Sequence, residues 1–100
     1  MKIIHKHNVP QDYAKQKIEN NFTDLISNLP NGIKIKKIER WWNDYELDFS
    51  FKVYKGFFSL PISGKIIVEK EAVVFDIELP ALISEDMIRE VIAENLKDLF

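Results

Sequence analysis

Two histidines near the start of the chain are the residues whose types and spacing come closest to a chemical site. His5 and His7 flank Lys6, so on an extended strand both imidazoles lie on one side, about 7 Å apart. Two imidazoles could begin a metal site or transfer protons. A metal site needs more ligands than two, and no third ligand stands at a recognisable spacing. We therefore interpret them as an exposed pair on a terminal strand, and we expect neither a metal nor a cofactor.

Two pairs of carboxylates could in principle divide the roles of acid and base. Asp76 and Glu78 form one pair, and Glu46 and Asp48 form the other. Each pair lies on the polar side of an alternating strand, where side chains face water. The chain has no cysteine and three glycines, which excludes thiolate chemistry and argues against a glycine-rich phosphate loop. The sequence therefore predicts a protein that is not an enzyme.

The charge balance argues against a nucleic-acid partner. The net charge is −2 and the isoelectric point is about 5.7, whereas general nucleic-acid binders are strongly basic. Four basic residues between Lys34 and Arg40 do precede Trp41 and Trp42, an arrangement that can stack bases. Given the acidic total, we interpret this segment as a strand with one buried and one snorkelling tryptophan.

The start of the chain is too short and too polar for a signal peptide, and no apolar run approaches the roughly 20 residues of a membrane span. We therefore expect a cytoplasmic protein without a membrane span.

The order of hydrophobic patterns predicts the fold. Period-two alternation and helical spacing follow one another along the chain, and they predict strands near 3–7, 33–42, 45–53, 57–69 and 73–79, with helices over 10–29 and from 84 onwards. This order, β-α-β-β-β-β-α, indicates a single α+β domain over residues 1–100. We expect a twisted antiparallel sheet with both helices packed on one face.

Local signals mark where these elements begin, bend and end. We expect turns at Asn43-Asp44, Lys55-Gly56 and Lys70-Glu71, a β-bulge near Lys36-Lys37, and the end of the first helix at Pro30-Asn31-Gly32. Further signals are Pro61, which requires an edge or a bulge, Gly64, which suggests a bend, and Ser84, which is a good helix N-cap.

A surplus of apolar residues on the polar side of the strands is the most suggestive functional feature. Phe57, Pro61, Ile67 and Val74 lie there, with Trp41 or Trp42 beside them. If helices cover the other face, these six residues are a candidate interaction surface for a partner, a polymer or a second copy of the chain. Alternatively, a curled sheet could bury them around its own core or around a cavity. The sequence leaves both readings open, and homo-oligomerisation with them.

Short motifs along almost the whole chain resemble the putative polyhydroxyalkanoic acid system family of small bacterial proteins. They are His7-Asn8 ahead of a helix with Ala14 and Ile18, Trp42 before a turn and Leu47-Asp48-Phe49, Gly64-Lys65-Ile66 with Val68, and Glu78-Leu79-Pro80 before a helix from about Ser84. The chain departs from the pattern in its lysine content and in the segment 57–61.

This resemblance implies a role in the bacterial polyhydroxyalkanoate system, and it supplies no catalytic residues to transfer. Our first hypothesis is a non-enzymatic binding or accessory protein that contacts polyhydroxyalkanoate granule polymer or a granule protein through the apolar surface. The alternative is a small protein that binds an apolar ligand between sheet and helix. That alternative predicts a cavity of several hundred Å³ lined by residues such as Phe49, Phe51 and Phe75.

Overall fold

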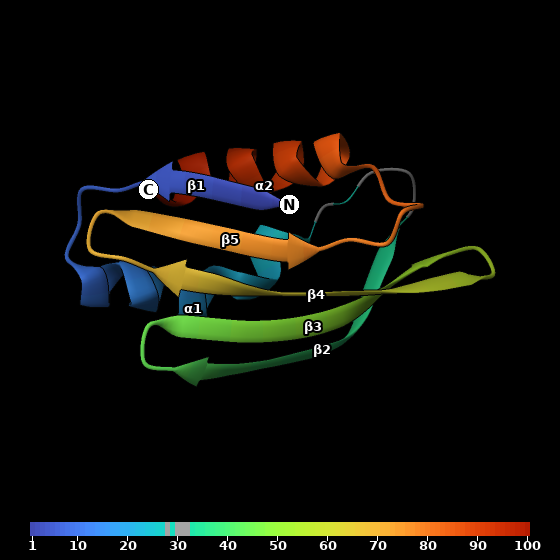
Figure 1. The fold of residues 1–100 in the computed structure, drawn as a ribbon, viewed down its shortest axis with the longest axis horizontal. Coiled ribbons are helices and arrows are strands. Elements are labelled where there is room, and N and C mark those ends of the chain that lie inside the picture. Colours follow the sequence, from blue (N-terminus) through green and yellow to red (C-terminus); the bar gives the residue numbers. More distant parts are fainter. Residues whose placement is uncertain (28, 30–32) are drawn as a thin grey trace.

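The fold is an α+β domain in which two helices cover one face of a five-stranded sheet (Figure 1). The computed structural model describes residues 1–27, 29 and 33–100. The elements are β1 (Lys2–Lys6), α1 (Gln11–Ile26), β2 (Lys34–Asn43), β3 (Glu46–Lys55), β4 (Phe58–Val68), β5 (Ala72–Glu78) and α2 (Glu85–Leu99). The predicted fold class and element order are thus confirmed. The strand order, which the sequence did not give, is β1-β5-β4-β3-β2, with every neighbouring pair antiparallel.

The core lies between the sheet and the helices. Alternate residues of β3, β4 and β5 point to the helices, and every third or fourth residue of each helix points back. The buried members are Leu47, Phe49, Phe51, Val53, Ile62, Ile66, Val68, Val73, Phe75 and Ile77 from these strands, and Ala14, Ile18, Phe22, Leu25, Ile26, Ile88, Ile92 and Leu96 from the helices. Neither α1 nor α2 covers the opposite face of the sheet, which is called the open face below (Figure 1).

Two of the three predicted turns lie one residue later than the sequence suggested. Asn43 pairs with Glu46, so the first turn is formed by residues 44 and 45. Lys55 pairs with Phe58, so the second turn is formed by residues 56 and 57. In each hairpin the first turn residue has positive φ, 54° at Asp44 and 61° at Gly56, which these residue types tolerate. Phe57 is therefore a turn residue and not the first residue of a strand.

Two other local predictions are confirmed. The β2–β3 register shifts between Lys36 and Glu39, which confirms the predicted bulge, and Lys37 in this stretch has a left-handed φ of 57°. Ser84 caps α2 because its hydroxyl oxygen accepts the Met87 N–H at 3.3 Å. The predicted extent of the first helix to residue 29 is wrong, because α1 ends at Ile26 and Ser27 is extended. The predicted stop at Pro30-Asn31-Gly32 lies outside the described residues.

The hairpin of β3 and β4 extends past the rest of the sheet. Strand β5 pairs with β4 from Ser63 to Val68, and β2 meets β3 from Tyr54 inwards. Residues 55–58 therefore form a two-stranded projection, seen at the right of Figure 1. Residues 59–62 form an edge of the sheet, because β5 pairs with β4 only from Ser63 onwards, and Pro61 lies on this edge, opposite Lys52. Its position agrees with the expectation that a proline without an N–H donor stands where the sheet has an edge.

Candidate functional site

An apolar groove lies where the projecting hairpin faces the start of α2. It has a volume of about 420 Å³ and is lined by Ile33, Val53, Lys55, Phe58, Leu60, Leu82, Ile83, Ser84 and Met87. The lining comes from the residue before β2, from β3 and β4, from the segment before α2 and from the first turn of that helix. The volume is within the usual range for sites that bind small molecules. The groove is therefore large enough to hold an apolar group from outside the protein.

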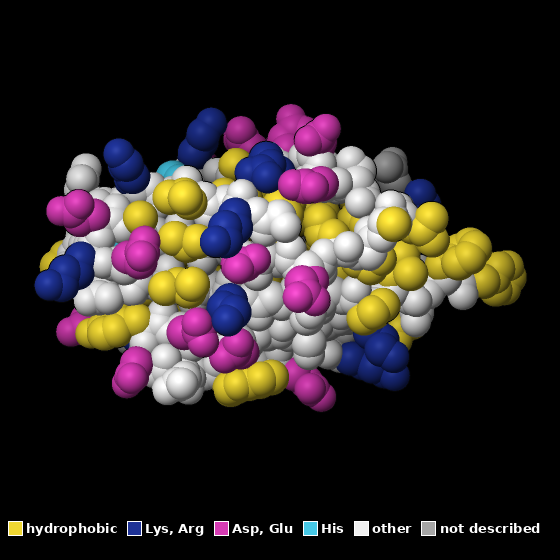
Figure 2. Space-filling view, viewed as in Figure 1, with side chains coloured by type: hydrophobic (Ala, Val, Ile, Leu, Met, Phe, Trp, Pro, Cys, Tyr) yellow, Lys and Arg dark blue, Asp and Glu magenta, His cyan; other side chains and the backbone are white. Residues whose placement is uncertain are grey.

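Exposed aromatic side chains continue the groove outwards to the tip of the hairpin. Phe57 is fully exposed, Phe58 is 68% exposed, and Leu82 on the opposite wall is 78% exposed. Figure 2 shows apolar side chains gathered at this end of the molecule. Single exposed apolar residues are ordinary, but neighbouring ones around a groove are typical of contact surfaces. The term apolar end is used below for the groove together with Phe57, Phe58 and Leu82.

The structure separates the six residues that the sequence proposed as an interaction surface. Phe57 and Pro61 lie on the projecting hairpin, and both are exposed. Ile67 and Val74 are half-buried partners on β4 and β5, toward the other end of the open face. Ten residues of extended β4 separate Ile67 from Phe57, which corresponds to roughly 33 Å.

Ile4 is an exposed apolar residue of the open face that the sequence analysis missed. It stands opposite Val74 on β1 and is 67% exposed. With Ile67 and Val74 it forms a short apolar row across three strands of the open face. The open face therefore has an apolar row near one end, and the hairpin tip provides a separate apolar surface at the other.

The two tryptophans have different environments, as the sequence suggested. Trp41 stands opposite Asp48 on the open face and is 56% exposed. Trp42 is partly buried against the core on the helix side. Its indole Nε1 donates to Glu19 Oε2 at 2.6 Å. Trp42 thus belongs to the packing between β2 and α1, and only Trp41 lies on the open face.

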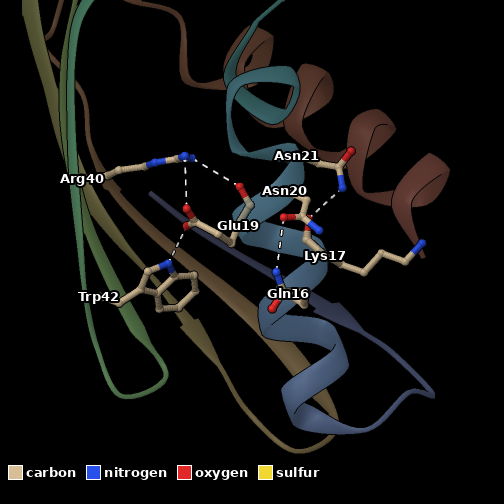
Figure 3. Close-up of polar contacts among 7 residues, drawn as sticks. All are labelled: Gln16, Lys17, Glu19, Asn20, Asn21, Arg40 and Trp42. Carbon is tan, nitrogen blue, oxygen red and sulfur yellow. Dashed lines mark hydrogen bonds and ion pairs between the residues drawn. The ribbon is translucent and has the colours of Figure 1, made fainter.

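Glu19 joins the edge strand β2 to helix α1 (Figure 3). Besides accepting from Trp42, its carboxylate pairs with the Arg40 guanidinium at 3.2 Å. The Lys15 ammonium lies 4.9 Å from the centre of the Trp42 ring. Asp12 accepts a hydrogen bond from the Tyr45 hydroxyl, and chiefly for this reason the pKa of Tyr45 is raised above its ordinary value. These polar contacts hold α1 against the turn and end of the β2–β3 hairpin.

Replacing Glu19 with alanine should lower the unfolding free energy by about 1 kcal/mol, because a hydrogen bond to a charged group is lost while the ion pair with Arg40 is partly screened. Trp42→Phe should show a similar loss, and the double variant should lose less than the sum. Urea unfolding of the four proteins measures this coupling. Glu90→Ala, an exposed change on α2, is the control. Strictly additive losses would mean that the Trp42–Glu19 hydrogen bond does not contribute in solution.

The histidine pair was predicted to be exposed, and this prediction is wrong. His7 is 6% exposed, and His5 is half-buried. Both rings lie against Phe100, with centroid distances of 5.6 Å for His7 and 5.9 Å for His5. His7 Nδ1 accepts the Val9 N–H at 3.4 Å, so Nε2 carries the proton and donates to the Glu69 carbonyl at 3.1 Å. His7 therefore connects the start of the chain to the β4–β5 turn.

The predicted carboxylate pairs lie on the open face among alternating charges. Asp48, Lys65 and Asp76 stand opposite one another on three neighbouring strands. Glu46 pairs with Lys65 at 3.7 Å. Such cross-strand charge pairs are typical of a solvated sheet surface. Among the described residues, no three metal-ligating side chains cluster together.

The core cavity proposed for an apolar ligand is contradicted. The space that Phe49 and Phe51 help to line between sheet and helices holds about 20 Å³, roughly the room for one water molecule. Phe75 does not line it and is completely buried. Large side chains from both helices fill the space that the alternative required. The groove at the apolar end is the larger apolar space, and it opens at the surface.

Sequence reasoning missed most of the groove. The proposed surface did not include Phe58, Leu82 or Met87. Phe58 directly follows Phe57, and Leu82 lies after Pro80 in a segment without periodicity. Two adjacent phenylalanines after a turn glycine are the signal that could have identified the tip. The contribution of Leu82 and Met87 depends on long-range folding that brings them to the hairpin.

Among the described residues, neither helix is both long enough and apolar enough to cross a membrane.

Comparison with known proteins gives one result. No curated protein and no solved structure matches the chain. A family model described as putative polyhydroxyalkanoic acid system protein matches residues 1–100, which confirms the resemblance seen in the sequence. The chain therefore belongs to the putative polyhydroxyalkanoic acid system protein family.

Proposed function

We propose that this protein is a non-enzymatic accessory protein that contacts polyhydroxyalkanoate granules in the bacterial cytoplasm through its apolar end. The family gives the polyhydroxyalkanoate system as the setting. The observation that carries the proposal is the fully exposed Phe57 beside exposed Phe58 at the tip of a projecting hairpin. Burying two such side chains on an apolar polymer or on a granule protein removes apolar surface from water, which favours binding.

The position of these side chains makes them suitable for contact with a large object. They stand at the end of the molecule, beyond the strands that flank the hairpin. A flat or gently curved polymer surface can therefore reach them without displacing the rest of the fold. The apolar row of Ile4, Ile67 and Val74 is the other surface that could meet a polymer, but Ile67 and Val74 are already half-buried.

The experiment is co-sedimentation with amorphous polyhydroxybutyrate particles, with polystyrene beads as a comparison surface. The variant Phe57→Ser/Phe58→Ser should bind the polymer particles at least about tenfold more weakly than the wild type, because the exposed aromatic surface of the apolar end is gone. Its unfolding free energy should be nearly unchanged, since neither side chain is buried in the fold.

Ile4→Ser is the matched control, because it removes a 67% exposed apolar side chain from the other surface. It should bind the particles like the wild type. If the hairpin variant binds as tightly as the wild type while Ile4→Ser does not, the contact is the apolar row and the proposal is wrong about the surface. Self-association through the apolar end would compete with particle binding and would appear as a larger sedimentation coefficient of the free protein.

A second function is favoured by the groove itself. Its volume of about 420 Å³ could hold a small apolar ligand. Such a ligand would stabilise the native protein in proportion to its concentration and would leave Phe57, which does not line the groove, free. Stabilisation by a soluble short-chain ester, with no binding to polymer particles, would favour this function over granule contact.

A further inference from the structure

Positive charge is concentrated in the half of the sheet that carries the apolar end. Segments 33–38 and 51–64 contain five lysines and no aspartate or glutamate. These are Lys34, Lys36, Lys37, Lys52 and Lys55, called the lysine group below. Since the whole chain has a net charge of −2, the remaining residues together carry −7. The hairpin side of the apolar end is therefore basic, although the total charge of the chain is close to neutral.

The lysine group is not neutralised within the fold. Each of the ion pairs formed by described residues uses a basic side chain outside the group, namely Arg40, Lys65, Arg89 or Lys97. Four of the five lysines are exposed, and Lys52 is half-buried. Their charges are therefore available to a partner from outside.

The register places two of these lysines against each other. Lys36 and Lys52 are direct partners on β2 and β3, an arrangement that destabilises a sheet because like charges are opposed. Lys34 stands opposite Tyr54 on the same face, and the Lys36 ammonium lies 5.5 Å from the centre of the Tyr54 ring. The fold thus holds several ammonium groups on one side of the hairpin despite their repulsion, which a negatively charged partner would relieve.

The lysine group is continuous with the apolar end. Lys55 is the cross-strand partner of Phe58 and also lines the groove. In Figure 2, basic side chains lie near the apolar tip, and both acidic and basic side chains lie over the rest of the visible face. On the groove's far wall, Glu85 and Asp86 follow Ser84, but Glu85 is paired with Arg89 at 3.1 Å. The cations thus lie on the hairpin side of the apolar end, and the acidic residues lie on its helix side.

We propose that this end docks on an anionic lipid surface, with Phe57 and Phe58 among the acyl chains and the lysine group facing the headgroups. The inference rests on the proposed function, because it uses the same apolar end and specifies the surface that this end meets. Aromatic side chains beside lysines are the combination that binds lipid interfaces, where apolar burial and attraction to anionic headgroups add. The ammonium groups of snorkelling lysines can also reach the headgroup level while the neighbouring rings insert among the acyl chains.

A lipid surface suits these observations better than a nucleic acid or a folded protein would. The aromatic pair stands at a projecting tip, which can enter a fluid apolar layer, and the groove below it has Phe58 as its one aromatic lining residue, whereas base stacking uses several aromatic side chains. A folded partner would require a preformed pocket for two adjacent phenylalanines. A lipid layer requires only charge complementarity, and the lysine group supplies the positive partner.

The test is flotation of the purified protein with vesicles of phosphatidylglycerol and phosphatidylcholine in equal amounts, compared with vesicles of phosphatidylcholine alone. The wild type should bind the anionic vesicles at least about tenfold more tightly, and raising the salt concentration should weaken this binding. The variant Lys34→Gln/Lys36→Gln/Lys52→Gln should lose at least about tenfold in affinity for the anionic vesicles. Phe57→Ser/Phe58→Ser should lose binding to a similar degree.

The matched control is Lys2→Gln/Lys6→Gln/Lys70→Gln, which removes the same charge from exposed lysines outside the lysine group. It should bind like the wild type. Equal loss in both lysine variants would overturn the inference, because binding would then follow total charge and not a docking site. Wild-type protein that binds neither vesicle, or both equally, would also overturn it.

Polymer particles separate this inference from the proposed function. The lysine variant should still bind amorphous polyhydroxybutyrate, which is uncharged along its chain, if the apolar end alone makes that contact. Binding to polymer without binding to anionic vesicles would overturn the lipid inference and leave granule contact intact. Binding to anionic vesicles without binding to bare polymer would support the lipid inference and contradict direct polymer contact. Thermal unfolding of each variant verifies that it is folded.

Discussion

Alanine at position 64 should lower the unfolding free energy by about 3 kcal/mol, because a side chain there collides with the neighbouring strand. A Cβ atom on Gly64 would lie 2.4 Å from the Asp76 carbonyl oxygen and 2.9 Å from the Ile77 Cα atom. Both are backbone atoms, so a change of rotamer cannot relieve the contact. Strands β4 and β5 would have to move apart in the centre of the sheet. Urea unfolding of Gly64→Ala against the wild type measures the cost.

Ser63→Ala is the control, since Ser63 is the preceding residue and faces the solvent on the open side. It should change the unfolding free energy by less than about 0.5 kcal/mol. A loss in Gly64→Ala as small as that of the control would mean that β4 and β5 are farther apart in solution. The projecting hairpin would then be anchored differently, because β4 carries it.

The sequence predicted those parts of the fold that depend on local periodicity. Phe49 and Phe51 alternate with Asp48 and Ser50 along β3, and the structure buries the first two as expected. Ala14, Ile18 and Phe22 recur at helical spacing and form the buried side of α1. In these elements a residue's neighbours in the chain determine which face it occupies, so the pattern is sufficient.

Long-range pairing could not be predicted from the same patterns. Strand β1 pairs with β5, more than 60 residues away, and no local signal specifies that partner. The burial of His7 depends on contacts with Glu69 and Phe100, which come together only after the chain has folded. An alternating strand with two histidines therefore looked exposed although one of its faces is covered.

The candidate site combines both kinds of information. Phe57 was identified because an apolar residue falls on the polar side of an alternating segment, which is a local signal. The groove needs Leu82 and Met87 to meet Phe58, and that meeting depends on the path of the chain from β5 into α2. The lysine group is also partly local, since its members cluster in two segments, but only the β2–β3 register shows that Lys36 and Lys52 face each other.

The proposed docking on an anionic lipid surface would give the molecule a defined orientation there, because the exposed aromatic side chains and the lysine group lie near one end. The hairpin tip and the lysine group would approach first, while α2, with Glu90, Glu94 and Asp98, would remain in water. This orientation would leave the acidic helix available to a second partner. It also separates the residues that make the contact from those that maintain the fold, so that the two can be changed independently.

Phe75→Ala tests whether the core between the sheet and the helices is densely packed. It should lower the unfolding free energy by about 4 kcal/mol. Phe75 is completely buried in the middle of the sheet, opposite Ile3 on β1 and Ile66 on β4. Removing its ring takes apolar surface out of the core and leaves a cavity that these neighbours can fill only in part. Since small domains have about 5–15 kcal/mol of stability, urea unfolding should be measured at low temperature.

Val74→Ala is the matched control for Phe75→Ala, because it is the adjacent residue on the half-buried open face. It should cost less than about 1 kcal/mol, since its side chain is already in partial contact with water. The difference between the two variants measures how much the helix-covered face contributes beyond the open face. If Phe75→Ala lost no more stability than Val74→Ala, the space between sheet and helices would be loosely filled in solution. An apolar ligand bound there would then regain support over contact through the hairpin tip.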